Sequence, residues 1–385
     1  MHWPGTPVER LQLFRPNFCP WPGCREHHRT TPGYRFLRHG TYRTETRTVP
    51  RFLCRACRRS FSRQSFALSY YLKRPQLVIP VAAGLQAGSA HRQLARNLGC
   101  APSTITRLSA RLGRHAMLLM ALALRHLRGG LVEPVVLDHF ETFEFTQDLP
   151  FGIATPVGRD SWFVYGLDPA PHARTGRRSA EQEARRMLRP ERSRRGGYEG
   201  SSARTIRLLL ALCPRGGRLE LAGDGHRSYD RAVQQPGLAG RVRLHRFPNP
   251  RRGPKGSPRS PEARARDQAM FPVDALHGLI RHTAAHHRRE TIAFGRRLNA
   301  LLERLFLTVA WRNFIKGRSE RRPDPVTPAM RLGLASEPWT WRRTLARRLF
   351  PARESLSRVW RDLYRRDWIT PVLPSNTRHR LFHAY

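Results

Sequence analysis

Residues 134–145 read Pro-Val-Val-Leu-Asp-His-Phe-Glu-Thr-Phe-Glu-Phe. The stretch is rich in β-branched and aromatic residues and its apolar spacing departs from the helical period, so we predict one long β-strand. Asp138 directly follows the apolar run Val135 to Leu137. An ionised carboxylate inside a buried strand is unfavourable unless it is paired or binds a metal. The stretch therefore predicts the first strand of a sheet and a candidate metal ligand within it.

The segments after this strand alternate between strand and helix patterns. A hairpin is predicted from strands at residues 151–157 and 161–167 with a turn at 158–160. A polar, arginine-rich insertion at about 172–200 is followed by a helix, a strand, a helix and a strand at residues 201–212, 218–222, 228–233 and 241–247. We expect a flexible loop over 249–267 and a helix from Val273 onward. This order is typical of an α/β fold with an RNase H-like mixed sheet.

A second aspartate, Asp224, follows the fourth predicted strand in Gly223-Asp224-Gly225. The first and fourth strands are neighbours in an RNase H-like sheet, so we expect Asp138 and Asp224 to lie close together. With a third acidic group they would hold two divalent ions about 3.5–4 Å apart, which act on the attacking and leaving oxygens of a phosphodiester. Mg²⁺, or Mn²⁺ in its place, suits such an oxygen-rich site.

The third carboxylate has three candidates in the C-terminal part of the chain: Asp274, Glu290 and Glu303. Leucines at positions 298, 301, 302 and 305 form an apolar helix face and leave Glu303 on the polar face. Asp274 opens its predicted helix and shares a face with His277 and Arg281. A carboxylate with cationic neighbours suits phosphate chemistry, so we predict that Asp274 is the third ligand and that Arg281 contacts DNA. His139 and His226 are secondary candidates for orienting phosphate or water.

Four cysteines near the start of the chain form two closely spaced pairs. Residues 19–24 read Cys-Pro-Trp-Pro-Gly-Cys, and residues 54–57 read Cys-Arg-Ala-Cys. Cys19, Cys24, Cys54 and Cys57 can complete a tetrahedral structural zinc site. Two predicted strands between the pairs, residues 34–37 and 44–52 with a turn at Gly40, give the layout of a zinc ribbon. The alternatives are a disulfide pair, disfavoured because we expect no signal peptide, and replacement of one cysteine by His27 or His28.

Two helices predicted after the cysteine module have the spacing of a helix-turn-helix. The first runs from Ser89 to Gly99 and the second from Thr104 to Leu112. In this motif the second helix enters the DNA major groove. An ordinary helical hairpin is the alternative, and a packing helix is predicted at residues 114–130. The predicted DNA-contacting residues are the N-cap candidate Ser103, Thr104, Thr106, Arg107 and Arg111.

The composition favours a polyanionic partner. The chain has 385 residues, of which 70 are Lys or Arg and 28 are Asp or Glu, for a formal net charge of +42. Neutralising phosphates releases the counterions condensed on nucleic acid, so a charge of this size favours nucleic acid as the partner. The longest apolar run, residues 117–124, is too short to cross a membrane. We therefore expect a cytoplasmic, nucleoid-associated protein.

The chain resembles the DDE transposases of short bacterial insertion sequences, in which a zinc ribbon and a helix-turn-helix precede an RNase H-like domain. The resemblance covers most of the chain. It rests on the cysteine set, on Leu137-Asp138 and Gly223-Asp224-Gly225, and on Asp274 and Arg281 followed by Arg288-Arg289-Glu290-Thr291-Ile292-Ala293-Phe294. It implies that the acidic residue at position 274 supplies the third metal ligand. Two departures are Asp274 in place of the usual glutamate and Gly295-Arg296-Arg297 in place of the usual Ser-Lys-Ser.

The combined prediction is a DNA transposase that binds terminal inverted repeats and carries out two-metal strand cleavage and strand transfer. The predicted boundaries are 1–66 for the zinc ribbon, 67–130 for the helix-turn-helix and connecting helix, 131–320 for the catalytic domain and 321–385 for a basic, tryptophan-containing tail. We expect a homo-oligomer, because two transposon ends react together. A DNA-binding regulator or domesticated transposase with an inert catalytic domain, and an RNase H-like nuclease without strand transfer, stay open as alternatives.

Overall fold

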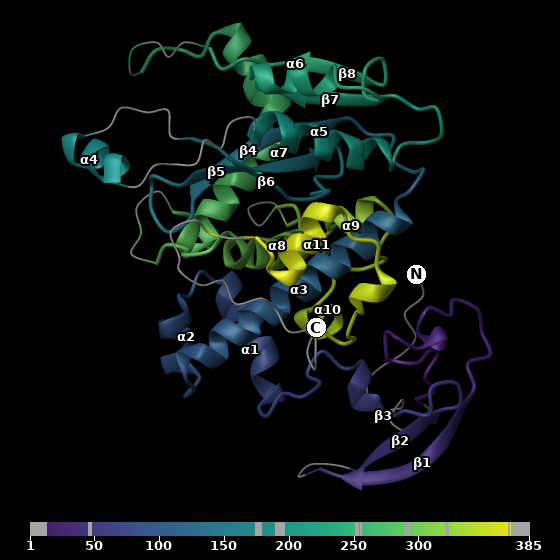
Figure 1. Ribbon diagram of the computed structural model, residues 1–385. Coiled ribbons are helices and arrows are strands. Elements are labelled where there is room, and N and C mark those ends of the chain that lie inside the picture. Colours follow the sequence, from purple (N-terminus) through teal and green to yellow (C-terminus); the bar gives the residue numbers. More distant parts are fainter. Residues whose placement is uncertain are drawn as a thin grey trace.

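The computed structural model describes residues 14–44, 48–173, 179–188, 197–250, 254, 256–288, 291, 293–319, 323–368 and 370. Three parts follow one another along the chain (Figure 1): a small β-sheet with the N-terminal cysteines, a helical region around one long helix, and a five-stranded sheet flanked by helices. The C-terminal helices return to the long central helix. The protein is thus multi-domain, with a mixed α/β sheet and a separate four-cysteine module.

The N-terminal module is an antiparallel sheet of β1 (Phe36–Arg43), β2 (Thr48–Cys54) and β3 (Ser60–Ser62), in that order. Two 3-10 turns, η1 (Arg25–His27) and η2 (Arg63–Phe66), flank it. The predicted turn at Gly40 is wrong, because Gly40 lies inside β1 at φ +70°, where the pairing register shifts between Arg38 and Thr41. A glycine at positive φ accommodates a β-bulge, so the strand bends and continues.

The helical region contains η3 (Pro75–Leu77), α1 (Val78–Gln86), α2 (His91–Asn97) and α3 (Pro102–His126). The predicted break between residues 104–112 and 114–130 is wrong, because α3 runs without interruption through Gly113. At Gly113, α3 crosses α8 (Leu298–Phe314), and a Cβ at this position would lie 2.6 Å from the Cα of Glu303. The glycine therefore allows a close helix crossing instead of ending a helix. Ser103 is not the N-cap either, since Ala101 precedes the first helical residue, Pro102.

The large sheet has β4 (Val135–Phe143) at its centre. Its other strands are β5 (Pro150–Gly158), β6 (Asp168–Pro171), β7 (Leu219–Gly223) and β8 (Val242–Arg246), and the order is β6-β5-β4-β7-β8. Pairing is antiparallel among β6, β5 and β4 and parallel from β4 through β7 to β8. The predicted first, second, fourth and fifth strands are confirmed by β4, β5, β7 and β8. The continuous buried runs of β4 and β5 reflect strands that are covered on both faces, whereas β8 has no buried residue.

The third predicted strand is only partly correct. The chain turns at residues 159–161, close to the predicted turn at 158–160, and Val164 bridges back to Val157, but the continuous strand β6 begins later, at Asp168. Val157 faces Val164, and Ala154 faces Asp168. Three steps along β5 therefore correspond to four steps along the returning segment, so the returning segment contains one extra residue between these pairs. Such an insertion bends the strand and re-aims the side chains beyond it.

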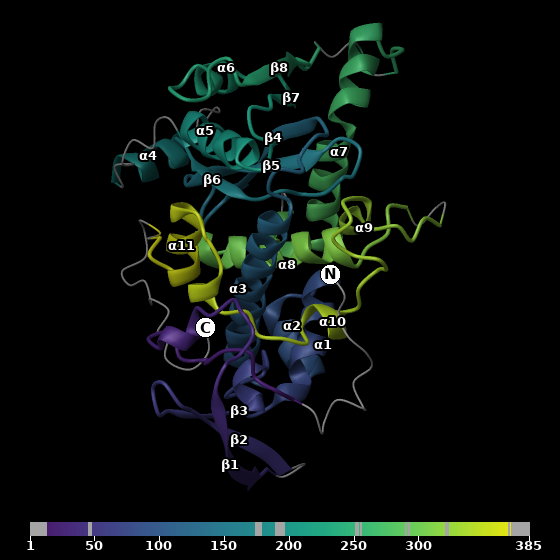
Figure 2. The same cartoon turned by 90° about the vertical axis from the view of Figure 1, so that its right-hand side faces the viewer.

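Helices cover the two faces of the large sheet (Figure 2), with α5 (Gly197–Leu210) on one side and α7 (Pro261–Thr283) on the other. A short helix, α4 (Ala180–Leu188), lies in the arginine-rich insertion, and another, α6 (Arg227–Val233), follows β7. Part of that insertion lies outside the described residues.

The predicted flexible loop at 249–267 is wrong in its second half, because α7 already begins at Pro261. Ser260 is the N-cap and its hydroxyl accepts the Ala263 N–H at 3.2 Å. The helix also continues through Pro272, where a helix usually ends because proline lacks an N–H. A serine before a proline at the first helical position is the stronger signal.

The C-terminal segments pack against the body of the protein. They contain η4 (Ala285–His287), α8, α9 (Pro328–Arg331), α10 (Trp341–Thr344), η5 (Pro351–Arg353) and α11 (Arg358–Arg365). Trp339 stacks on Phe314 with ring centroids 4.6 Å apart. Trp360 packs on Phe306 and donates its indole N–H to the Leu167 carbonyl at 2.8 Å. These tryptophans are core residues, so the described part of the predicted tail belongs to the folded body.

Candidate functional site

The four N-terminal cysteines meet in one cluster, with their sulfur atoms all within 4.8 Å of one another. The Cys19 and Cys57 sulfurs are 3.7 Å apart, and those of Cys24 and Cys54 are 3.8 Å apart. A tetrahedral ion at about 2.3 Å from each sulfur requires sulfur–sulfur separations of about 3.8 Å. The geometry therefore fits one bound metal ion. Within the described ranges, no second set of three or more His, Cys, Asp or Glu ligand atoms is this compact.

The surroundings of the cluster are buried and aromatic. Burial raises the pKa of Cys19 and of Cys24. Burial also raises the pKa of Cys54, but hydrogen bonds from Tyr34 and from the backbone outweigh it and lower that pKa to about 7. A thiolate is the form that binds metal, so these donors prepare Cys54 for coordination. His27 is also buried, but its Nδ1 lies 2.8 Å from the Cys19 carbonyl oxygen, which gives it a supporting role.

A second candidate site lies where β4 and β7 run side by side. The parallel pairing joins Val136 to Ala222, so Asp138 and Asp224 each stand two residues beyond the same paired position. Asp138 is on the central strand, and Asp224 begins the connection from β7 to α6. The Asp224 carboxylate accepts the His226 N–H at 3.0 Å. The register thus brings the two predicted aspartates to the same edge of the sheet.

The electrostatics of Asp138 reflect several charges at this edge. Its pKa is raised to about 7, first by burial and then by the negative charge of Asp224. The Asp274 carboxylate adds to the increase, while the His139 N–H, 2.7 Å from Asp138 Oδ1, opposes it. The three carboxylates thus influence one another electrostatically. Their oxygen atoms do not all approach one another within 4.8 Å, as the cysteine sulfurs do.

The structure adds His277 to this site, a residue that the sequence pattern marks only as a neighbour of Asp274. His277 Nδ1 lies 3.8 Å from Asp138 Oδ2, and its Nε2 is 2.8 Å from the Thr155 hydroxyl. That hydroxyl donates its only proton to the Asp138 carbonyl, so it must accept from His277 Nε2–H. Burial lowers the pKa of His277 to about 3. A neutral imidazole therefore presents the Nδ1 lone pair to the carboxyl group. The i+3 spacing from Asp274 is the signal in the sequence.

The third predicted carboxylate, Asp274, lies in the middle of α7 and not at its start. Its side chain is 39 % exposed and forms an ion pair with the Arg266 guanidinium. The prediction that Glu303 lies on the polar face of its helix is wrong, because Glu303 is buried on α8. Arg114 at 3.1 Å and Arg366 at 2.6 Å neutralise Glu303, which makes it a structural residue. The other alternative, Glu290, lies outside the described residues.

The two secondary histidines lie on the other side of the β4–β7 edge. His139 follows Asp138 on β4, is buried, and places its Nδ1 3.0 Å from the Tyr229 hydroxyl. The exposed ring of His226 lies 5.3 Å from that of Tyr198. Burial lowers the pKa of His139 to about 3, so this histidine is neutral. Successive strand residues point to opposite faces, which explains why His139 does not join Asp138.

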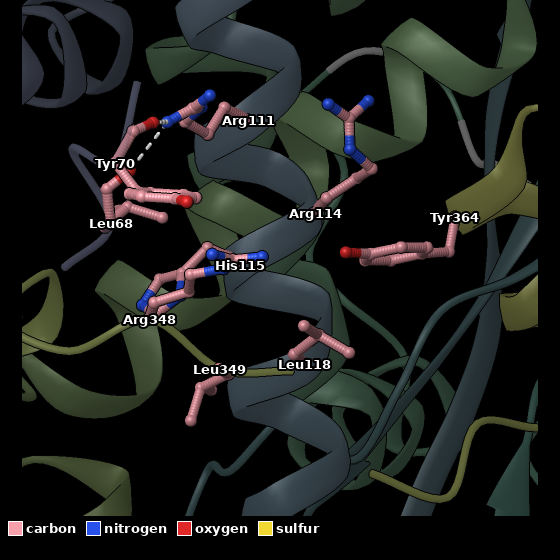
Figure 3. Close-up of a pocket in the computed structure, with 9 residues that line it drawn as sticks. All are labelled: Leu68, Tyr70, Arg111, Arg114, His115, Leu118, Arg348, Leu349 and Tyr364. Carbon is pink, nitrogen blue, oxygen red and sulfur yellow. Dashed lines mark hydrogen bonds between the residues drawn. The ribbon is translucent and has the colours of Figure 1, made fainter. Parts of the chain in front are cut away.

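The predicted DNA-contacting residues differ in exposure. Ser103, Thr106 and Arg107 are exposed at the start of α3, and Thr104 is half-buried. Arg111 is different, as Figure 3 shows: its guanidinium donates to the Leu68 and Tyr70 carbonyls, both at 2.8 Å. The cavity drawn there has a volume of about 10 Å³, room for about one water molecule. Arg111 therefore joins α3 to the segment that follows the cysteine module.

Arg281 likewise has a structural position. Its guanidinium donates to the His287 carbonyl at 2.6 Å and to the Glu141 carbonyl at 2.8 Å. It also lies over the Phe140 ring, 4.5 Å from the centroid. These contacts attach the end of α7 to β4, so Arg281 holds the helix that carries Asp274 and His277.

Comparison of the chain with protein-family models, with characterised proteins and with solved structures gave no match. In the described part of the chain, no helix combines the length and the apolarity needed to cross a membrane. The candidate sites are therefore interpreted from their own geometry.

Proposed function

We propose that the protein is a DNA transposase whose catalytic carboxylates are Asp138, Asp224 and Asp274. The observation that carries the proposal is the register of β4 and β7, which aligns Asp138 with Asp224 opposite the α7 helix. The sheet order β6-β5-β4-β7-β8, with two antiparallel and two parallel pairings, agrees with an RNase H-like fold. In that fold a two-metal phosphodiester site lies at this sheet edge.

The remaining parts are assigned to DNA binding. We interpret the four-cysteine module as a zinc ribbon that holds one structural Zn²⁺. The pair α2 and α3, joined across Gly99, is interpreted as a helix-turn-helix that presents Ser103, Thr106 and Arg107. The net charge of +42 supports double-stranded DNA as the partner. Two DNA ends would require two such chains in one assembly.

The proposed chemistry divides between the metal and the protein. The three aspartates would hold two Mg²⁺ ions, which supply activation of the attacking oxygen and stabilisation of the leaving oxygen. His277 is held in place by the Thr155 hydroxyl and lies beside Asp138, with its Nδ1 3.8 Å from Oδ2. Arg266 neutralises Asp274 when no cation is bound. With Asp274 engaged in metal binding, the Arg266 guanidinium would be free to pair with a DNA phosphate.

The test is Mg²⁺-dependent cleavage of a duplex carrying the DNA that flanks the gene. Asp138→Asn and Asp224→Asn should each lower the cleavage rate by at least about 100-fold, because metal ions at reacting oxygens contribute several kcal/mol. Glu220→Gln is the matched control, because Glu220 is a carboxylate on β7 that pairs with His245 away from the aligned aspartates. Full Mg²⁺-dependent cleavage by the two aspartate variants would refute the catalytic assignment.

A DNA-binding regulator with an inert catalytic domain is the second candidate, favoured by the existing ion pair between Arg266 and Asp274. Such a protein would bind the duplex in the presence of Mg²⁺ and leave it uncut. Cleavage without joining of the 3′ end to a second DNA would instead indicate a nuclease.

A further inference from the structure

A cluster of aromatic and cationic side chains lies beside Asp274. Trp162 comes from the hairpin turn after β5, Phe271 from α7, and Arg312 and Arg318 from the end of α8 and the segment after it. The Trp162 and Phe271 ring centroids are 5.5 Å apart at an interplanar angle of 64°. The guanidinium groups of Arg312 and Arg318 lie over the Trp162 ring, 5.6 and 4.7 Å from its centroid. We call these four residues the aromatic platform.

Two members of the platform, Phe271 and Arg318, are exposed to solvent, whereas Trp162 is half-buried and Arg312 is buried. Phe271 is 54 % exposed, although buried Met270 and Val273 flank it on the core side of α7. Asp274 is one helical turn further along, so the exposed ring and the carboxylate share one helix face. Asp267, one turn earlier, is already paired with Arg259. An exposed phenyl ring next to a polar site is a feature that packing alone does not require.

The backbone of the platform is held in an unusual conformation. Trp162 has φ +62°, in the left-handed region that bulky residues rarely adopt. The hairpin is fixed from α8, because the Asn313 amide exchanges two 3.0 Å hydrogen bonds with the backbone of Val164. Strain of this kind persists where surrounding contacts enforce it, and it is concentrated at functional positions.

The two arginines have different environments. Arg312 is buried, with only 6 % of its surface exposed, and its Nη1 has no hydrogen-bond partner among the described residues. Burial lowers the pKa of Arg312 to about 10, which still leaves it charged at neutral pH. Arg318 is exposed and forms no ion pair with a described carboxylate. Arg312 therefore supports the indole from below, and Arg318 offers a cation to a ligand.

We propose that the aromatic platform binds an unpaired nucleotide of DNA, with the base stacked on the exposed Phe271 ring, which Trp162 contacts edge to face, and with the phosphate paired with Arg318. Bases within a duplex are already stacked on each other, so only an unpaired base can offer its face to a protein ring. The combination of exposed ring and exposed guanidinium complements a base and a phosphate. This inference rests on the proposed function, since it places a single-stranded part of the substrate one helical turn from Asp274.

The test is equilibrium binding of a short single-stranded oligonucleotide that contains 2-aminopurine, in buffer without added divalent cation. Phe271→Leu should weaken binding by about 5- to 100-fold, because it removes one stacking surface and keeps an apolar side chain. Phe271→Tyr should bind like the wild type and quench the fluorophore equally. Arg318→Gln should reduce the slope of affinity against salt by about 0.7. Val132→Ala, at an 82 % exposed apolar residue of another segment, is the control.

A fully paired duplex separates the platform from the other DNA-binding surfaces. Phe271→Leu should leave duplex binding unchanged, because the proposed duplex-binding surface is formed by the cysteine module and by α2 and α3. Equal losses for duplex and single strand, or wild-type binding of the single strand by Phe271→Leu, would overturn the proposal. If Phe271→Leu loses single-strand binding and the wild-type protein does not cleave DNA, the nucleotide-binding proposal stands and the transposase proposal is rejected. If cleavage depends on Asp138 but Phe271→Leu binds the single strand like the wild type, the transposase proposal stands and the nucleotide-binding proposal is rejected.

Discussion

At the scale of single residues, half-buried His91 and buried His287 contribute to the pH response of the protein. Burial and the charge of Arg304 lower the pKa of His91 to about 4, and burial lowers that of His287 to about 3. The unfolded chain binds a proton at each of these histidines near pH 6.5, whereas the folded chain does not. Stability from these groups is therefore present above pH 6.5 and is lost as the pH falls toward 4.

His91 provides a test of this linkage, because its Nδ1 lies 3.1 Å from the Thr106 hydroxyl and joins α2 to α3. His91→Gln should reduce the slope of unfolding free energy against pH by up to about 1.4 kcal/mol per pH unit between pH 4 and 6.5. Denaturant unfolding at several pH values measures it. Asp138 and Glu354 have pKa values raised to about 7, so their contribution to the unfolding free energy falls as the pH rises. That contribution is the same in the wild type and in His91→Gln, so it cancels in the comparison. Identical slopes for the two proteins would contradict the assignment.

At the scale of elements, the crossing of α3 and α8 joins the predicted DNA-binding helices to the sheet. Gly113 allows the two backbones to meet, and the buried ion pairs of Glu303 with Arg114 and Arg366 close the same contact. Removing one partner of a buried ion pair leaves an uncompensated charge, so this crossing tolerates little change.

Gly113→Ala should therefore destabilise the protein by about 1–3 kcal/mol or more, since the new methyl group would overlap the backbone of Glu303. Gly278→Ala on α7 is the matched control, because no atom lies within 4 Å of the position that its methyl group would take. That control should be neutral or gain about 0.5–1 kcal/mol from helix propensity. Unfolding free energies measure both variants, and equal stabilities would mean that the helices can move apart without cost.

At the scale of the whole molecule, residues after α10 attach the four-cysteine module to the body. The Phe350 ring contacts Phe18, His27 and Phe66, with centroid distances of 5.4, 5.4 and 5.9 Å. The Arg353 guanidinium lies 3.8 Å from the Phe18 centroid and donates to the Arg29 carbonyl at 3.2 Å. Segments that are far apart in sequence thus form one interface.

Phe350→Ala should loosen this attachment, because truncating a buried phenylalanine costs about 3–5 kcal/mol. Hydrogen exchange should accelerate in the 14–66 module while the β4–β7 region keeps its protection. The variant should retain its metal, since no cysteine of the cluster is changed. Phe294→Ala, at an exposed ring, serves as the control. Uniform acceleration across the chain would indicate global destabilisation instead.

Several local features can be predicted from the sequence because their causes are local. The strands β4, β5, β7 and β8 follow from β-branched and apolar runs bounded by turn residues. The convergence of Cys19, Cys24, Cys54 and Cys57 follows from two short cysteine loops on one small sheet. Asp138 and Asp224 can be identified because a carboxylate that directly follows an apolar run requires a partner.

The sequence by itself determined four strands of the large sheet, the four-cysteine cluster, and the aspartates Asp138 and Asp224 that follow apolar runs, since short-range periodicity and spacing carry that information. Only the tertiary structure decided that Gly113 lies in a continuous helix, that Glu303 is a buried structural residue, and that His277 stands beside Asp138. It also placed Trp162 next to Phe271. Each of these outcomes depends on contacts between segments more than 100 positions apart in the sequence. Packing and desolvation at such contacts outweigh the local preferences on which sequence patterns depend.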